Sequence, residues 1–180
     1  CGFIVIGVDN LSSGLRSTFN SHVTYKNFIP FVCDITSNKI EEIFRLNKIK
    51  YVFHLAAQSG VVPSIENPVF SDLSNVNATL RLLDLSKKYE VERFIFSSSS
   101  SVYGGSDGDI SSEADETSPR SPYALQKLTA ENYCKLYSNE FGLDTVSLRY
   151  FNVIGARQRA DSAYAAVLPA FSMCRKIGAP

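Results

Sequence analysis

Residues 93–104 decide the fold: they read Arg93-Phe94-Ile95-Phe96-Ser97-Ser98-Ser99-Ser100-Ser101-Val102-Tyr103-Gly104. The apolar residues before the serines predict a buried strand. A flexible linker is the alternative interpretation of five serines, but a linker would not continue a buried strand without a break. In a parallel sheet, ligands bind at the carboxyl ends of the strands. The run therefore predicts a strand that carries hydroxyl groups into a binding site.

Segments on both sides of this run alternate between strand and helix patterns. Further strands are predicted at residues 3–8, 29–33, 51–55 and 145–150, the first two of them buried. Helices are predicted at residues 39–47, 77–89, 122–141 and 167–177, and an exposed loop at 104–121. This alternation predicts an α/β fold, a doubly wound parallel sheet covered by helices on both faces.

Composition excludes several classes of partner. The chain has 180 residues, 44% of them hydrophobic, and its 18 basic residues balance 18 acidic ones. It therefore has no net field to attract nucleic acid or an anionic membrane. No apolar run reaches the roughly 18 residues that span a bilayer. The four cysteines have neither CxxC spacing nor a histidine partner, which favours free thiols in the cytoplasm and argues against a metal site.

Tyr123 and Lys127 are the first candidate catalytic pair. Their spacing of four places both side chains on one face of the predicted helix. A lysine ammonium near a tyrosine favours the phenolate, so it lowers the pKa of the phenol toward that of a useful base. The pattern alone is weak, because two such residues also fit a solvated helix face. The upstream serines strengthen it, since a serine hydroxyl could bind a substrate hydroxyl while Tyr123 removes its proton.

Other strand ends carry candidate ligand contacts. Asp9 could accept both hydroxyls of an adenosine ribose, which would favour NAD over NADP, or it could cap a turn. Ala56 and Ala57 are small enough for a flat cofactor to approach the backbone, and His54 just before them fits a packed core residue. Arg157 could bind phosphate or lie in a surface loop.

Together these stretches resemble the nucleotide-sugar epimerases of the extended short-chain dehydrogenases/reductases, over nearly the whole chain. The matching stretches, in order, are Val8-Asp9-Asn10-Leu11-Ser12-Ser13-Gly14, Asp34-Ile35, His54-Leu55-Ala56-Ala57-Gln58, Asn75-Val76-Asn77, the serine run with Val102-Tyr103-Gly104, Ser121-Pro122-Tyr123-Ala124-Leu125-Gln126-Lys127 and Arg149-Tyr150-Phe151-Asn152. Each motif is modest, whereas the ordered set is specific. The resemblance implies a Rossmann-like fold and NAD as cofactor.

The resemblance also implies a role for each matching residue. Ser99 would be the catalytic hydroxyl and Tyr123 the base, while Lys127 would bind the nicotinamide ribose and tune Tyr123. Asn152 and Arg157 would join Ser99 and Tyr123 in binding a UDP-sugar. The expected cofactor contacts are Asp9 and Asn10 at the adenosine ribose, Asp34 and Ile35 at the adenine, Ala56, Ala57, Gln58 and Ser97 along the dinucleotide, and Tyr123, Lys127 and Phe151 at the nicotinamide end.

The implied reaction is epimerisation at C4 of a UDP-hexose, UDP-N-acetylglucosamine or UDP-glucose, through a 4-keto intermediate. Within the epimerases, residues 149–170 look most similar to UDP-N-acetylglucosamine 4-epimerases of bacterial surface polysaccharide synthesis. Sugar 4,6-dehydratases carry an Asp-Glu pair where Ser100 and Ser101 stand, and UDP-glucuronate decarboxylases commonly keep the Glu. These enzymes and a sugar-nucleotide reductase are the alternatives, as is a non-catalytic NAD-binding regulator, which typically loses the Tyr or the Lys.

The resemblance implies that this chain is part of a longer protein. Residues 1–152 would form a partial NAD-binding Rossmann domain, and residues 153–180 the start of the substrate-binding region. The first βα unit, with its Gly-rich turn and a central strand, and a C-terminal substrate lobe would lie outside the sequence. We therefore expect this chain to be inactive and unstable alone. A homodimer is expected through the helices that start near Ser71 and Pro122, with Leu80, Leu83 and Leu128 assigned either to that interface or to the core.

Overall fold

A computed structural model describes residues 2–105, 110–153 and 155. The chain divides into two compact units, Cys1–Arg149 and Tyr150–Pro180. The helix predicted at residues 167–177 and the candidate phosphate ligand Arg157 lie outside the described residues. The predicted domain boundary after residue 152 stays a prediction.

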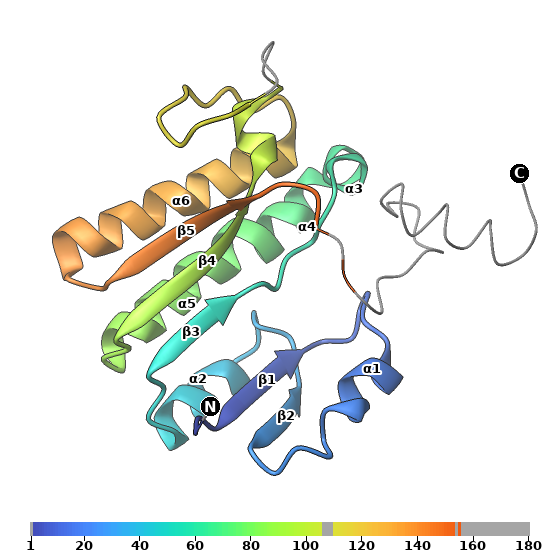
Figure 1. Ribbon diagram of the computed structural model, residues 1–180, viewed down its shortest axis with the longest axis vertical. Helices are drawn as coiled ribbons and strands as arrows, with labels where there is room; N and C mark the ends of the chain where they lie inside the picture. The colour runs from blue at the N-terminus through green and yellow to red at the C-terminus, as the bar shows by residue number, and fades with distance from the viewer. Residues whose placement is uncertain (1, 106–109, 154, 156–180) are drawn as a thin grey trace, which may run out of the picture. The chain divides into compact units, whose positions relative to one another are not determined.

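In the described part of the chain, five strands form two separate sheets (Figure 1). Strands β1 (Val5–Asp9) and β2 (Phe28–Val32) pair in parallel. Strands β3 (Tyr51–His54), β4 (Arg93–Ser99) and β5 (Thr145–Tyr150) form the second sheet in the order β3-β4-β5, with β3 and β4 parallel. The predicted α/β fold with parallel pairing is confirmed, and each strand lies within a few residues of its predicted position.

The long helices also lie where their sequence signals place them. The helix α6 (Pro122–Phe141) has the predicted bounds, because Ser121 accepts a hydrogen bond from the Ala124 N–H at its start and Gly142, at φ 72°, ends it. The helices α2 (Lys39–Leu46) and α5 (Ala78–Lys88) are close to prediction. The short elements that were not predicted include the helices α1 (Arg16–Ser21), α3 (Val61–Glu66) and α4 (Pro68–Asp72), and the π-helical turn η1 (Leu73–Asn77).

The main core lies between the three-stranded sheet and the helices α2, α5 and α6. Phe94 and Phe96 of β4 are fully buried there against Leu83 of α5 and Cys134 of α6. Figure 1 shows α5 and α6 running along the same face of this sheet. On β3 the side chain of Phe53 is 67% exposed, so the described residues leave this position on the sheet uncovered.

The prediction that β1 and β2 are buried is wrong. Val5 of β1 and Phe31 and Val32 of β2 are exposed. Among the described residues these two strands pair only with each other, so neither lies inside a larger sheet that would bury both of its faces. A ring contact does link the two parts of the unit, since Phe3 packs edge-on against Tyr51 at the start of β3, with 5.9 Å between ring centroids.

The serine run is partly strand and partly turn. Strand β4 continues to Ser99, and the 3₁₀ turn η2 (Ser100–Tyr103) follows, so the strand is three residues longer than its apolar part predicts. Gly104 ends the turn in the left-handed region at φ 74°. A Cβ at this position would lie 1.8 Å from the carbonyl oxygen of Ser118, so the backbone near the end of the predicted loop lies directly against its start. No helix in the described part of the chain is long and apolar enough to cross a membrane.

Candidate active site

Ser99, Tyr123 and Lys127 converge at the carboxyl end of β4. Ser99 is the last residue of β4, and Tyr123 and Lys127 lie on the first two turns of α6, which packs against that strand. The hydroxyl of Ser64 on α3 accepts a hydrogen bond from the Tyr123 backbone N–H at 3.0 Å. The strand β4 and the helix α3 therefore hold the start of α6 in place.

Lys127 is buried, although lysine is rarely so. Its side chain is 4% exposed, and its Nζ donates a hydrogen bond to the Ser97 carbonyl oxygen at 2.8 Å. The ammonium lies 4.8 Å from the ring centroid of Phe96 and 5.8 Å from that of Tyr123. Burial lowers the pKa of Lys127 to about 8, which leaves the amine mostly protonated at pH 7. The alternative of a solvated helix face is therefore excluded for this residue.

Two effects act in opposite directions on Tyr123. Burial of its ring raises the pKa of the phenol, and a hydrogen bond with the Ser99 side chain lowers the pKa. The expected lowering of the Tyr123 pKa by Lys127 is therefore not the dominant effect in this structure. Lys127 is not among the groups that shift the Tyr123 pKa, so only the Ser99 hydrogen bond opposes the effect of burial.

The serine run makes two further sets of contacts. Ser99 caps η2: its Oγ accepts hydrogen bonds from the backbone N–H of Ser101 at 3.2 Å and from the Ser101 hydroxyl at 2.9 Å. Ser98 donates to Oε1 of Glu131 on α6 at 2.5 Å. The same strand end therefore contacts both the candidate base and the middle of the helix that carries it.

Glu131 is a site residue that sequence reasoning missed. Its carboxylate forms a bidentate ion pair with Arg149 of β5, with 2.8 Å between Nη2 and Oε2 and 3.0 Å between Nε and Oε1. The two side chains are only 11% and 20% exposed. The hydrogen bond to Glu131 raises the pKa of Arg149, whose guanidinium lies 4.8 Å from the Tyr103 ring centroid. The one available signal was the position of Glu131, four residues after Lys127 on the same helix.

Asp9, Asn10 and Asp34 form a second polar cluster at the carboxyl ends of β1 and β2. Asn10 Nδ2 donates to Asp34 Oδ2 at 2.7 Å, so the predicted adenosine contacts are brought together. Asp9 accepts a hydrogen bond from the Leu11 N–H at 2.7 Å, and it therefore caps the turn in this structure. Hydrogen bonds from the Thr36 hydroxyl and N–H lower the pKa of Asp34, with a smaller contribution from Asn10. Ile35 beside it is partly buried against the core.

A buried amide network holds the segment after β3. The Asn75 side chain bonds both backbone groups of Gln58, at 2.8 Å to its N–H and 3.0 Å to its carbonyl. The Asn75 amide also donates to Gln126 Oε1 at 2.9 Å, and that oxygen accepts from Ser71 at 2.7 Å. Ala56 and Ala57 precede this anchored residue, so their backbone is held in place by contacts with η1 and α6. Asn75 was part of a recognised motif, but its side-chain partners could not be read from the sequence.

The remaining candidates are placed as follows. His54 is buried and hydrogen-bonded to Thr79, with 2.8 Å between Nε2 and Oγ1, so its assignment to the core is confirmed. Phe151 and Asn152 are exposed and belong to the second unit, so their approach to Tyr123 stays a prediction. Among the described residues there is no cluster of His, Cys, Asp or Glu suited to a metal ion.

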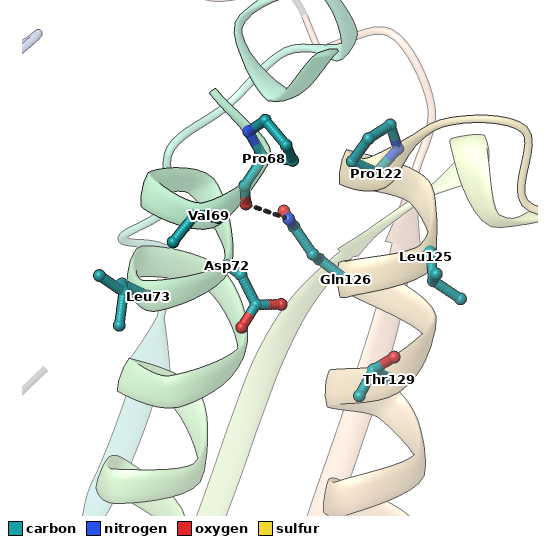
Figure 2. A pocket seen from close by; sticks show the side chains of 8 residues that line it. All are labelled: Pro68, Val69, Asp72, Leu73, Pro122, Leu125, Gln126 and Thr129. Atoms are coloured by element: carbon teal, nitrogen blue, oxygen red, sulfur yellow. Dashed lines mark hydrogen bonds between the residues drawn. The ribbon is translucent and has the colours of Figure 1, made fainter. Parts of the chain in front are cut away.

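A groove of about 390 Å³ lies between α4 and the first half of α6 (Figure 2). Gln126 reaches across it to the Pro68 carbonyl oxygen at 3.2 Å. Its walls and rim are largely apolar, and Val69, Leu73 and Leu125 along it are all exposed. Of the leucines considered for an interface, Leu83 lies in the core instead.

Comparison with known proteins agrees with this geometry. The model of the NAD-dependent epimerase/dehydratase family matches residues 2–179. The UDP-glucuronate 4-epimerase of Thermodesulfobacterium geofontis is 38% identical over 167 residues, which cover 89% of this chain and 51% of that protein.

Solved structures are similar as well. The UDP-N-acetylglucosamine 4-epimerase of Methanobrevibacter ruminantium M1, in complex with UDP-N-acetylmuramic acid, superposes with a TM-score of 0.91 at 39% identity, over 98% of this chain and 56% of that one. The UDP-glucose 4-epimerase of Thermus thermophilus, in complex with NAD, gives 0.87 at 34% identity, over 98% and 56%. The chain thus spans about half the length of the proteins that it matches.

Proposed function

The chain belongs to the NAD-dependent epimerase/dehydratase family, and from that membership we propose that the whole protein is a UDP-hexose 4-epimerase that acts on UDP-N-acetylglucosamine or UDP-glucose. The observation that carries the proposal is the buried Lys127 beside the partly buried Ser99 and Tyr123 at one strand end. A non-catalytic regulator would have no need for a buried lysine beside a tyrosine, because burying an ammonium is costly unless it serves a purpose.

NAD is the cofactor of this family, and the residues present fit it. Asp34 and Asn10 form a polar cluster suited to an adenosine, and Ala56 and Ala57 leave the backbone accessible along the dinucleotide. Lys127 supplies a cation where a nicotinamide ribose would offer hydroxyl acceptors. We assign these contacts, with Asp9, Ile35, Gln58, Ser97 and Phe151, to the cofactor.

The residues of this chain would remove the proton from the sugar C4 oxygen and later return it. Tyr123 as phenolate accepts the proton of the C4 hydroxyl, while Ser99 donates a hydrogen bond to the same oxygen. NAD, held by the cofactor contacts assigned above, would supply the acceptor and then the donor for the hydride at C4. Tyr123 then gives its proton back to the C4 oxygen, so no atom is gained or lost in a full cycle. Asn152 and Arg157 are the proposed UDP-sugar contacts.

The residues between β4 and Val102 favour an epimerase over the related dehydratases. Removal of water from a sugar needs a second acid/base pair in the site. Ser100 and Ser101 occupy η2 at that place, and neither is a carboxylic acid. The absence of carboxylic acids at these two positions supports the epimerase proposal.

The test uses the whole protein, incubated separately with UDP-N-acetylglucosamine, UDP-glucose and UDP-glucuronate, and followed by proton NMR of the anomeric region. We expect the galacto epimer of one substrate to appear without added reductant. Tyr123→Phe should lower the rate by about 10²–10⁴-fold. Tyr133→Phe, which removes a hydroxyl elsewhere on α6, is the matched control. A dehydrated or 4-keto product would refute the assignment as an epimerase, and an unchanged rate in Tyr123→Phe would refute the assigned base.

We also propose that the protein is a homodimer and that the apolar groove faces a second copy. Val69, Phe70, Leu73 and Leu125 expose their side chains on α4, η1 and α6, where solvent contact is unfavourable. Leu125→Glu should give a monomer in sedimentation analysis, whereas Leu136→Glu, also exposed on α6, should not. An unchanged sedimentation coefficient in Leu125→Glu would disprove this interface. The free thiols of Cys33 and Cys134 are compatible with the cytoplasm, which we propose as the compartment.

A further inference from the structure

We propose that Ser101 is a positioning residue, which holds Ser99 as a hydrogen-bond donor toward Tyr123 and the reacting oxygen of the substrate. Its kinetic consequence rests on the proposed function, whereas its effect on Tyr123 does not. Ser101 lies two residues beyond the strand end, in the second position of η2, and is partly buried.

The argument begins with the hydrogen-bonding capacity of a serine hydroxyl. A hydroxyl has one proton to donate and two lone pairs that accept. Ser99 Oγ receives the Ser101 backbone N–H at 3.2 Å and the Ser101 hydroxyl at 2.9 Å. Both acceptor positions of Ser99 are then occupied by one neighbouring residue. The single proton of Ser99 is then left for a partner outside η2, and a hydrogen bond between the side chains of Ser99 and Tyr123 lowers the pKa of the phenol.

This arrangement distinguishes the two protonation states of Tyr123. A phenolate can accept the Ser99 proton, whereas a neutral phenol that donates to Ser99 would compete for a lone pair already used by Ser101. Ser101 therefore favours the phenolate through Ser99 without touching Tyr123 itself. The Ser99 hydrogen bond does lower the pKa of Tyr123, in the direction that this reasoning requires.

The groups around Tyr123 allow this effect to be isolated. On its own helix, the Lys127 Nζ lies 5.8 Å from the ring centroid. The neighbouring α3 contributes the Ser64 hydroxyl and ends at the exposed Glu66. On η2, Tyr103 lies against the Arg149 guanidinium, and on β4, Arg93 pairs with Asp144 at the far end of the strand. A change at Ser101 leaves all of these charges in place.

The experiment compares Ser101→Ala with Ser100→Ala in the whole protein loaded with NAD. Both variants lose one hydroxyl from the same turn, but the Ser101 hydroxyl donates a hydrogen bond to Ser99 Oγ. Ser101→Thr keeps the hydroxyl and serves as the rescue. Ser101→Cys keeps the size with a weaker donor, so the result does not depend on the folding of the alanine variant. Phenolate formation by Tyr123 is titrated by ultraviolet difference spectra, with Tyr123→Phe subtracted.

In Ser101→Ala we expect the Tyr123 titration to move to higher pH by about half to one pH unit, the size of one net hydrogen bond. With the substrate that the unaltered protein uses, kcat should fall about three- to tenfold at neutral pH and KM should stay unchanged. Ser101→Thr should restore both values, Ser101→Cys should lie between, and Ser100→Ala should match the unaltered protein.

A Tyr123 titration in Ser101→Ala or Ser101→Cys that coincides with that of the unaltered protein would overturn the inference. An equal shift in Ser100→Ala would also overturn it, since any change in the turn would then suffice. If the unaltered protein turns over none of the UDP-sugars, the proposed function fails, and the titration still decides the role of Ser101. A melting temperature shared by the variants shows that the fold is intact in each.

Discussion

The ion pair between Glu131 and Arg149 offers a sharp test of how the site is held together. Glu131→Gln removes the charge but keeps the shape, so the Arg149 guanidinium loses its anionic partner while it is still largely enclosed. Breaking a well-buried pair costs about 3–5 kcal/mol, and the side chains here are 11% and 20% exposed. We therefore expect a loss of about 2–4 kcal/mol in the free energy of unfolding.

The chain contains a matched control for this change. Arg93 and Asp144 are also an arginine–carboxylate pair that joins β4 to the start of β5, with 2.6 Å between Nη2 and Oδ2, but their side chains are 53% and 49% exposed. Asp144→Asn should cost at most about 1 kcal/mol. Both losses are measured by urea unfolding of the whole protein, followed by circular dichroism at about 0.1 M and about 1 M salt.

Salt should separate the pairs further. The exposed pair is screened, so the small effect of Asp144→Asn should vanish at high salt, whereas that of Glu131→Gln should persist. Equal losses in the two variants, or a loss below about 1 kcal/mol in Glu131→Gln, would refute the reasoning that burial makes this pair matter.

Three other outcomes follow from the structure. Gly104→Ala should lower the free energy of unfolding by more than about 3 kcal/mol in urea, because the added Cβ clashes with the Ser118 carbonyl. Gly105→Ala has open space around it and should lose only about 1–2 kcal/mol through left-handed backbone strain. Equal losses would contradict this. Burial lowers the pKa of His54 to about 3, so the unfolded chain binds a proton that the folded chain does not, and stability should fall by up to about 1.4 kcal/mol per pH unit as pH drops below 6.5. His54→Gln should show a shallower fall in acid unfolding, and an unchanged slope would count against this. Asn75→Ala should weaken NAD binding about tenfold in calorimetric titration by releasing Gln58, whereas the exposed Asn77→Ala should not; similar affinities in both would argue against this role.

Strong local signals explain which elements could be predicted from the sequence. Pro122 at the first turn and Gly142 after the last define α6 at both ends, and the apolar stripe of α2 does the same for that helix. The short helices around Gly60 and Asn67 have too few residues for a periodicity to emerge. The extension of β4 through Ser97 to Ser99 runs against the turn preference of serine. The packing of α6 on β4 therefore sets the strand conformation of these residues.

In the candidate site, too, local features could be predicted from the sequence, whereas contacts between distant elements could not. Tyr123 and Lys127 could be paired from their spacing, because one helix face is a local property. The contacts of Glu131 with Ser98 and Arg149 join three elements that are distant in sequence, and nothing in the residue types specifies them. The burial of Lys127 was likewise beyond local reasoning, since it results from the packing of α6 on β4. Turn capping by Asp9 was foreseen as an alternative, and the structure contains it.

The separation of the two sheets has a consequence for folding cooperativity. The β1–β2 pair has exposed strands and few buried side chains, whereas β4, α5 and α6 enclose the core, so the first should open and exchange its amide hydrogens far more often than the second. The candidate adenosine contacts lie on the weakly protected part and the candidate base on the strongly protected one. A dinucleotide long enough to reach both would then act as a cross-link between two folding units, and its binding energy would be spent partly on making them unfold together.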